Sequence, residues 1–452
     1  MPKSKGQYQN LVLLLASYFF YAYWDVRYLA LLVGITGVNY YLGGKIALSQ
    51  AIRPKKRLLF LGVLINLGVL GCFKYFDFFL HGCRQMLEVL GIGIDTWTLS
   101  LILPLGVSFY IFQAVAYLVD VYRGEVPVSK NFVAFALFIS FFPQLVAGPI
   151  ERANRILPQL VQARTFSSPV AIHGLSLIAY GFFKKLVVAD RLSRYVNSLF
   201  GDIGQANTIS LSLGLIFFAF QIYCDFSGYS LIARGVAKLF GIELMVNFQK
   251  PYLSRDLPNF WRRWHISLST WFKDYLYIPL GGNRVGVAKH YRNLLIVFLL
   301  SGLWHGANWT FLVWGLWHGT FMVFYIAWRK LRPVNVEVSL LMSFIKVLTL
   351  NIIVGIGWIF FRADTLQMVG EYWRKLYELD FSINLAQLTV IYGPLNLALS
   401  FGMIVLLLFS YRLPDDLKFR RISHHFVFFT FSVLTIILFG VDEAATFIYF
   451  QF

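Results

Sequence analysis

The stretch LLIVFLLSGLWHGANWTFLVWGLWHGTFMVFYIAW (294–328) contains no Asp, Glu, Lys or Arg, and it decides the class of fold. It holds most of two apolar runs, 290–303 and 307–328. A helix needs about 20 mostly apolar residues to cross a bilayer, so each run is a candidate membrane helix. The stretch therefore predicts helices embedded in a membrane rather than the core of a soluble domain.

Runs of the same character occur along the rest of the chain. They lie at 10–24, 28–49, 58–80, 99–119, 131–148, 170–190, 208–224, 340–361, 390–411 and 425–440. Several are short, so we expect about ten to twelve spanning or re-entrant helices. The sequence shows no internal repeat, low-complexity linker or soluble domain. The predicted fold is an all-α, polytopic transmembrane helical bundle in which residues 1–452 form a single domain.

Composition agrees with this prediction. Of 452 residues, 58% are hydrophobic and 14% are charged, whereas a soluble protein has about 25% charged residues. The net charge of +18 would suggest nucleic acid in a soluble protein, but the basic residues cluster in short loops such as 53–57 and 329–332. This is the positive-inside pattern of membrane proteins, so no nucleic-acid partner is expected. It places the 51–57 loop in the cytoplasm and 81–98 outside.

Two stretches do not form simple membrane spans. In 141–160 three prolines and a glycine interrupt any continuous helix. The second, 247–284, is rich in charge, Trp and Pro, yet it is too apolar for an ordinary loop. Irregular backbone at membrane depth occurs only where it is buried in protein or lines a cavity. We therefore expect the functional site at these two broken stretches.

His305 is the strongest candidate for chemistry. It lies between Trp304 and Gly306 in an apolar run, where a titratable side chain indicates function. An imidazole, whose free pKa is about 6.5, can take up and return a proton near neutral pH. Gly306 would let a substrate approach the backbone, and Asn308 would share a helix face with His305 and orient its ring or polarise a carbonyl. The alternative is a structural histidine that bonds a neighbouring helix.

A second histidine, His265, lies 40 positions before His305 in the second broken stretch. It could bind or orient an acyl donor, or satisfy a buried backbone carbonyl, and the residues alone favour neither alternative. His318 repeats the Trp-His-Gly triplet. On a continuous helix it would be rotated by about 220° from His305, so we expect a packing role for it.

Basic residues gather around the second broken stretch. Arg262, Arg263, Lys273 and Arg284 form the densest set. They would suit an anionic donor such as a coenzyme A phosphate. Positive-inside placement explains them nearly as well, so both interpretations stay open.

Three other charged residues lie in or beside apolar runs. Asp225 is an acid at the end of one run, where we expect it to pair with a cation or to line a wet cavity. Lys184 and Lys185 end another run. We expect both lysines to reach the membrane interface with their charged heads, and phosphate binding is the alternative.

The sequence lacks the signatures of other chemistries. It contains no GxSxG, Walker loop, HExxH or CxxC, and its three cysteines show no metal or disulfide spacing. We therefore expect no metal site and no bound cofactor. Direct attack by an acceptor hydroxyl, with a histidine as base, is the simplest mechanism that these residues allow.

Six segments resemble the membrane-bound O-acyltransferase family, and most closely its bacterial alginate O-acetyltransferase branch. They are LLLASYFFYAYW (13–24), FFPQLVAGPIERANRILPQL (141–160), YCDFSGYS (223–230), FWRRWHISLSTWFKDYLYIPLGGNR (260–284), LWHGANWTFLVWGLWHG (303–319) and FIYFQF (447–452). Together they span nearly the whole chain, and the segments around His265 and His305 are the most specific.

The resemblance implies that His305 is the family's essential histidine and that His265 is its second active-site histidine. It also implies a helical bundle with a central, water-accessible tunnel. A cytoplasmic thioester would enter on one side, and the acceptor hydroxyl would be reached from the other. Members of this branch typically pass the acyl group to a polysaccharide through a partner acyltransferase in the periplasm or outside the cell.

The chain departs from the family pattern in two places. Family members usually have an apolar helix ahead of the segment at 13–24, whereas this chain begins only a few residues before it, so one helix could be missing from our count. The FSGYS motif is commonly followed by an acid, whereas here Leu231 follows Ser230. The resemblance therefore does not carry that acid's role to Asp225.

The expected function is O-acetyl transfer from a cytoplasmic thioester, with acetyl-coenzyme A as co-substrate, to an exported or cell-surface polysaccharide such as alginate. The expected location is the bacterial cytoplasmic (inner) membrane. Besides His305 and His265, we expect substrate contacts from a set of six residues: Asn308, Trp304, Asp225, Arg262, Arg263 and Lys273. One alternative is D-alanyl transfer to teichoic acid from a carrier protein. Another is a polysaccharide transporter, which broken helices also suit, but it leaves the two histidines without a role.

Overall fold

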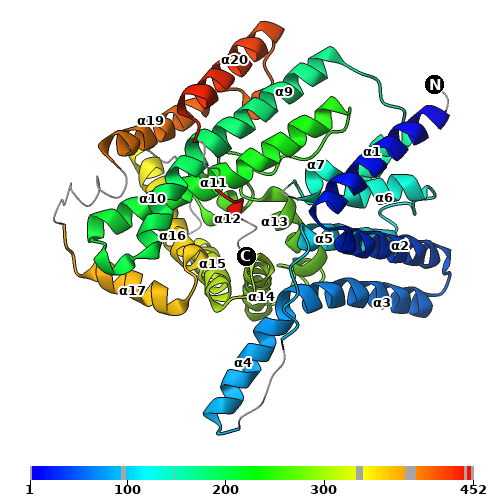
Figure 1. The fold of residues 1–452 in the computed structure, drawn as a ribbon. Coiled ribbons are helices and arrows are strands. Elements are labelled where there is room, and N and C mark those ends of the chain that lie inside the picture. The colour runs from blue at the N-terminus through cyan, green and yellow to red at the C-terminus, as the bar shows by residue number, and fades with distance from the viewer. Residues whose placement is uncertain are drawn as a thin grey trace. The chain divides into compact units, whose positions relative to one another are not determined.

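The computed structural model describes residues 3–92, 98–146, 148–331, 339–381, 393–441 and 445–448 (Figure 1). Within these ranges every regular element is a helix, and the predicted all-α class is confirmed. The residues group into two compact units. The N-terminal unit comprises Met1–Ala171 and Val236–Met245, and the C-terminal unit comprises Ile172–Gly235 and Val246–Phe452. That residues 1–452 form a single domain stays a prediction.

The N-terminal unit consists of helices drawn in blue and cyan in Figure 1. They are α1 (Lys3–Trp24), α2 (Val26–Leu48), α3 (Ile52–Leu70), η1 (Gly71–Tyr75), α4 (Phe76–Val89), α5 (Val107–Arg123), α6 (Phe132–Ser140), α7 (Phe142–Leu145) and α8 (Ala153–Val161). Asn39 on α2 and Asn66 on α3 are buried and exchange side-chain hydrogen bonds of 3.1 and 2.8 Å. Such polar pairs hold apolar helices together where hydrophobicity alone does not select a partner.

The first broken stretch, 141–160, is irregular as predicted. It forms only the short helices α7 and α8. Gly106, at the start of α5, has a φ of +69°, and a Cβ there would lie 2.1 Å from the carbonyl oxygen of Leu145. Glycine is therefore required at this position to let α5 approach the end of α7.

The C-terminal unit contains the remaining elements, although the end of the long helix Thr208–Leu239 belongs to the N-terminal unit. They are α9 (Ser168–Phe182), which begins in the N-terminal unit, η2 (Phe183–Ala189), α10 (Asp190–Gly201), η3 (Ile203–Gln205), α11 (Thr208–Leu239), η4 (Pro251–Leu253), α12 (Leu257–Trp261), α13 (Ile266–Phe272), η5 (Lys273–Tyr277), α14 (Val287–His305), α15 (Trp309–Leu331), α16 (Leu340–Arg362), α17 (Leu366–Tyr377), α19 (Pro394–Ser410), η6 (Asp415–Leu417) and α20 (Ile422–Phe439). The second broken stretch, 247–284, supplies η4, α12, α13 and η5, none longer than seven residues. The prediction of broken backbone here is confirmed.

Helices α14 and α15 form a tightly packed hairpin. A Cβ on Gly302 would lie 2.2 Å from the carbonyl oxygen of Phe311, and one on Gly315 would lie 2.3 Å from that of Phe298. The two backbones therefore touch at two points, which only glycine permits. This contact fixes the end of α14, where His305 lies.

Seven helical segments of the described residues are long and apolar enough to cross a membrane. They are Val26–Leu48, Ile52–Val89, Ser168–Gly201, Thr208–Leu239, Trp309–Leu331, Leu340–Arg362 and Ile422–Phe439. Two apolar helices, Phe132–Leu145 and Pro394–Ser410, are shorter. Several of the predicted ten to twelve segments thus form helices too short or too polar for a full crossing by themselves. The predicted orientation of 51–57 and 81–98 stays a prediction, and 93–97 lies outside the described residues.

Candidate active site

His265 and His305 approach each other in the C-terminal unit although 40 positions separate them in the sequence. Their ring centroids lie 6.4 Å apart, and the residues are only 1% and 4% exposed. Both line a cavity of about 100 Å³, which we call the histidine cavity. Its other lining residues are Trp261, Trp264, Leu268, Ser269, Phe272, Val297, Phe298 and Ser301. A space of this size can hold several water molecules or a small acyl group.

His305 is the last residue of α14, and the chain leaves the helix at Gly306 in an extended conformation. Its ring is enclosed by aromatic rings, with centroids 5.0 Å away at Trp314 and 5.1 Å away at Phe361. The expectation that Gly306 leaves room for a substrate was wrong. A Cβ at Gly306 would lie 2.2 Å from the ring of Phe311, so this ring already occupies the space.

His265 precedes α13 in a strained backbone conformation. Its φ of +43° and ψ of +55° belong to the left-handed region, which residues other than glycine rarely adopt. Such strain persists only where the surroundings enforce it, and it is common at functional sites. The ring packs edge-on against Phe226 at 4.6 Å and lies 5.7 Å from Trp304. The fold therefore holds His265 in one position beside His305.

Asn247 fixes the start of α13, although no pattern in the sequence singled out this residue. Its side-chain oxygen accepts hydrogen bonds from the backbone N–H (3.1 Å) and the hydroxyl (2.9 Å) of Ser267. Its backbone carbonyl accepts a third bond from the N–H of Ile266 at 2.9 Å. Asn247 thus ties the residues that follow His265 to the segment after α11. The only local signal was that Asn247 is a polar residue at the first position of the broken stretch 247–284.

Trp304 lies beside both histidines, whereas Asn308 lies outside the helix that was predicted for it, and substrate contacts of both stay predictions. Trp304 is 3% exposed, and its ring lies edge-on to His305 at 5.1 Å, so it borders both histidines. Asn308 does not share a helix with His305, because α14 ends at His305 and α15 begins at Trp309. Its side chain donates to the carbonyl of Asp364 at 2.7 Å and accepts from the N–H of Thr310 at 3.1 Å. It therefore caps α15, and the prediction of a shared helix face was wrong.

The basic set lies outside the wall of the histidine cavity. Arg262, Lys273 and Arg284 are exposed, and Arg263 is half-buried. None of the four is among the described residues that line this cavity. Their contact with an anionic donor stays a prediction.

Asp225 lies inside α11, which continues past it to Leu239. One of its oxygens is 2.8 Å from Nζ of Lys185, and the other accepts the backbone N–H of Ile448 at 2.8 Å. Lys185 also contacts Asp190 at 2.8 Å, so two carboxylates surround one buried ammonium. The predicted pairing of Asp225 with a cation is confirmed. A contact between Asp225 and substrate stays a prediction.

Lys184 and Lys185 do not extend to an interface as expected. Each is 4% exposed within η2, a π-helical turn. Consecutive side chains on a helix point in different directions, so the two lysines have different partners. Lys185 contacts the two carboxylates, whereas Nζ of Lys184 donates to the hydroxyl of Ser227 at 3.2 Å.

His318 is fully buried within α15. Its ring lies 5.1 Å from Trp261 and 5.0 Å from Trp314, and a Cβ on Gly357 would lie 2.6 Å from its Nε2. It is not among the described residues that line the histidine cavity. This environment supports the predicted packing role.

The arrangement suits proton transfer in an apolar space. Two imidazoles border one cavity, and an imidazole can accept a proton and return it near neutral pH. Aromatic walls limit the access of water, which protects a reactive ester or thioester from hydrolysis. Within the described ranges, no group of three or more His, Cys, Asp or Glu side chains could hold a metal ion.

Known proteins with similar sequences share one kind of chemistry. The sequence profile of the membrane-bound O-acyltransferase family matches residues 125–361. The "Probable alginate O-acetylase AlgI" of Pseudomonas aeruginosa is 40% identical over 405 residues, which are 89% of this chain and 75% of that protein. The "Peptidoglycan O-acetyltransferase" of Helicobacter pylori is 38% identical over 387 residues, covering 80% and 72%. The "Teichoic acid D-alanyltransferase" of Streptococcus thermophilus is 32% identical over 277 residues, covering 57% and 66%.

The matched range contains both histidines and the α14–α15 hairpin that positions them. Two of the relatives match most of this chain, and all three carry the name of an acyl-transfer enzyme. The apolar helices agree with a protein that crosses the membrane several times. The chain therefore belongs to the membrane-bound O-acyltransferase family and is a multi-pass membrane O-acyltransferase.

Proposed function

We propose that this enzyme transfers an acetyl group from a cytoplasmic thioester, acetyl-coenzyme A, to hydroxyls of an exported or cell-surface polysaccharide such as alginate. The observation that carries the chemistry is the approach of His265 and His305 at one buried cavity. The choice of acetyl and of a polysaccharide is supported by the names of the O-acetylating relatives.

His305 acts as the general base in the proposed reaction. One of its ring nitrogens takes the proton from the acceptor hydroxyl while the hydroxyl oxygen attacks the thioester carbonyl carbon. The carbon–sulfur bond then breaks, and the leaving thiolate takes the proton from the His305 imidazolium. The products are an oxygen ester and a free thiol, and the histidine returns to its starting state. No enzyme nucleophile takes part.

His265 holds the donor in the proposed reaction. Its strained backbone and the clamp by Asn247 keep its ring beside His305. From there it can hydrogen-bond the thioester and hold the carbonyl within reach of the attacking oxygen. The aromatic walls keep water away from the thioester during this step.

The proposed setting is the bacterial cytoplasmic membrane. Basic loops support a cytoplasmic position for one set of helix ends, where a soluble thioester is available. The acceptor is reached from the opposite side through a central tunnel. A partner acyltransferase in the periplasm or outside the cell would then complete delivery to the polymer.

D-alanyl transfer from a carrier protein is the second candidate. The similarity to a teichoic acid D-alanyltransferase favours it, at 32% identity over 57% of this chain. The O-acetylating relatives match more of the chain at higher identity, which supports the acetyl proposal. The donor test below separates the two candidates.

Release of free thiol from acetyl-coenzyme A tests the proposal. Purified enzyme in liposomes should release thiol in the presence of an acceptor polysaccharide, and the His305→Ala variant should not. Size-exclusion profiles and thermal stability of the two proteins serve as the folding control. If folded wild type releases no thiol even when the acceptor and the partner acyltransferase are both present, acetyl-coenzyme A is not the donor and the carrier-protein candidate replaces it.

A further inference from the structure

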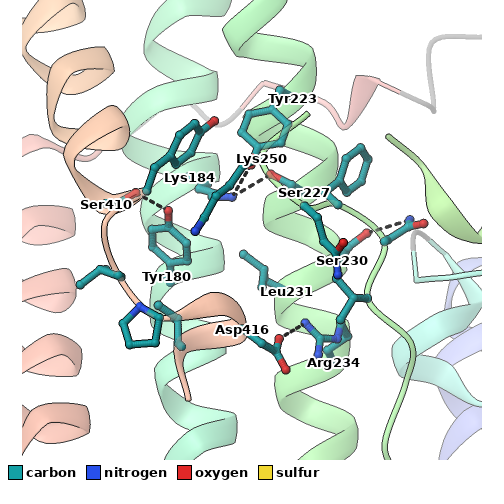
Figure 2. Close-up of a pocket in the computed structure, with 18 residues that line it drawn as sticks. Tyr180, Lys184, Tyr223, Ser227, Ser230, Leu231, Arg234, Lys250, Ser410 and Asp416 are labelled. Carbon is teal, nitrogen blue, oxygen red and sulfur yellow. Dashed lines mark hydrogen bonds and ion pairs between the residues drawn. The ribbon is translucent and has the colours of Figure 1, made fainter. Parts of the chain in front are cut away.

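A second cavity in the C-terminal unit is lined by charged side chains (Figure 2). It has a volume of about 110 Å³ and lies among α9, η2 and α11. Its wall carries three cations, Lys184, Arg234 and Lys250, and one carboxylate, Asp416. We call it the basic cavity. The proposed reaction assigns this cavity no role, and the sequence offered phosphate binding only as an alternative for Lys184.

Lys184 brings a buried ammonium group to this cavity. Its Nζ donates to the hydroxyls of Tyr223 at 3.3 Å and Ser227 at 3.2 Å (Figure 2). It also lies 4.8 Å from the ring centroid of Tyr180 and 4.7 Å from that of Tyr223. An ammonium has three donors, so two bonds to hydroxyls leave one donor for a ligand. Within the described residues no carboxylate forms an ion pair with it, and a buried charge without a counter-ion is costly.

The neighbouring Lys185 provides an internal comparison. It is equally buried, but it contacts Asp190 and Asp225, each at 2.8 Å. It also donates to the backbone carbonyl of Ala445 at 2.8 Å. One lysine of this pair is thus neutralised by protein carboxylates, whereas Lys184 lines a cavity. The difference indicates that an external anion neutralises Lys184.

The rest of the wall keeps the cavity positive. Arg234 is 3% exposed and forms an ion pair with Asp416 at 2.5 Å. The charges of this pair offset each other, so the described lining residues offer Lys184 no other carboxylate. An ammonium group beside hydroxyl and amide groups suits the charge and the hydrogen-bonding capacity of a phosphate.

The basic cavity adjoins the histidine cavity. Phe248 lines the basic cavity, and its ring centroid lies 6.3 Å from that of His265. Asn247, which also lines it, accepts the hydrogen bonds that fix Ile266 and Ser267. A phosphate bound here would therefore lie about one side-chain layer from His265. A pantetheine-like arm is long enough to continue from such a phosphate to the histidines.

The charges of a neighbouring loop indicate which side of the membrane the basic cavity faces. The segment that contributes Asp416 to the wall also carries Arg412, Lys418, Arg420 and Arg421. A short loop this rich in Lys and Arg is typical of the cytoplasmic side. Soluble thioester donors are found on that side.

We propose that the basic cavity binds a phosphate group of the thioester donor, with Lys184 as its main cation. The identity of the donor rests on the proposed function, whereas the need for an anion follows from the charges of the cavity itself. A phospholipid head group has the same chemistry. The contact of Phe248 with His265 favours the donor, because it links the cavity to the site of acyl transfer.

Equilibrium binding tests the proposal without turnover. Wild-type enzyme in phosphatidylcholine nanodiscs is compared with Lys184→Met, which keeps the length of the side chain but removes its charge. Coenzyme A should bind Lys184→Met at least about tenfold more weakly than wild type, because a charge-assisted contact to phosphate is lost. Pantetheine, which has no phosphate, should bind both proteins equally. Lys346→Met is the matched control, because Lys346 is exposed and lies outside the cavity wall.

Steady-state kinetics then locate the phosphate. Lys184→Met should raise KM for acetyl-coenzyme A by the factor by which it weakens coenzyme A binding, with little change in kcat. KM for S-acetylpantetheine should not change. If S-acetyl-4′-phosphopantetheine shows the same rise in KM, the site binds the phosphate next to the pantetheine. If only acetyl-coenzyme A shows the rise, the site binds a phosphate of the nucleotide.

Three outcomes would overturn the proposal. Equal weakening of coenzyme A and pantetheine would mean that Lys184 has only a structural role. Unchanged binding of both would mean that no phosphate of coenzyme A contacts Lys184. The cavity would be assigned to a lipid head group if phosphatidylglycerol co-purified with wild type but not with Lys184→Met while both proteins bound coenzyme A equally. By contrast, Lys184-dependent binding of coenzyme A without His305-dependent thiol release would refute the proposed function and leave the phosphate site in place.

Discussion

The tetrapeptide Leu-Trp-His-Gly occurs twice, at 303–306 and at 316–319, and the two copies have different environments. In the first copy His305 ends α14 and borders the histidine cavity. In the second copy His318 lies within α15, and aromatic rings and the backbone of Gly357 surround it. Both histidines are buried, so burial does not separate them. The difference is an open space beside one ring, at the end of a helix.

Replacing His305 should have the largest effect on activity, and it tests whether the histidine beside the open space is the catalytic one. His305→Ala should lower the rate of thiol release from acetyl-coenzyme A by about 10³-fold, because general acid–base catalysis contributes about 10²–10⁴-fold. The variant should keep its elution volume and most of its thermal stability. A rate within tenfold of wild type would mean that the first copy is no more catalytic than the second.

Replacing His265 should have the next largest effect. His265→Asn is the sharpest variant, because Asn tolerates the left-handed backbone conformation and removes only the imidazole. We expect kcat/KM for acetyl-coenzyme A to fall by about 10²-fold, with the melting temperature unchanged or higher. If thermal stability and activity fall together, His265 serves the fold and not the reaction.

Asn308 tests whether the residues just after the first copy belong to the site. Asn308→Ala should lower stability by about 1 kcal/mol, because α15 loses its capping side chain. The rate of acetyl transfer should stay within about threefold of wild type, since a cap acts on the helix and not on the reacting atoms. A rate loss of 100-fold at unchanged stability would restore the prediction that Asn308 polarises a carbonyl.

His318 should give the smallest effect. Its ring nitrogens form no hydrogen bond within the described part of the chain, so an apolar side chain of similar size removes no polar partner. His318→Leu should therefore change stability by less than about 1.5 kcal/mol and keep the rate of thiol release. A fall in rate comparable to that of His305→Ala would erase the distinction between the two copies.

Much of the fold was predictable because a membrane helix can be recognised from a local run of apolar residues. A long apolar run must bury its backbone polar groups in its own hydrogen bonds, so runs such as 340–361 form helices wherever they pack. Breaks were equally visible, because proline and charge interrupt the pattern at 141–160 and 247–284. Hydropathy alone did not reveal that α14 stops at His305, and because of this boundary Asn308 does not share a helix face with His305.

The site was only partly predictable, because its contacts are long-range. His305 stood out as a polar residue in an apolar run, and resemblance to the family added His265. Their separation of 6.4 Å depends on how α13 and α14 are placed around one cavity. The roles of Asn247 and Lys184 depend on residues that are distant in the sequence, and no local pattern encodes those partners. The basic cavity is accordingly a finding of the tertiary structure.

The left-handed backbone of His265 has a consequence for engineering this enzyme. A non-glycine residue in that conformation costs about 1–3 kcal/mol, which Gly or Asn would largely recover. A library of variants screened only for thermal stability should therefore enrich Gly and Asn at this position. The selected variants should have a higher melting temperature and a lower rate of acyl transfer. Selection that couples survival to acyl transfer would retain the histidine. The position is thus a convenient marker of whether a selection scheme rewards durability or catalysis.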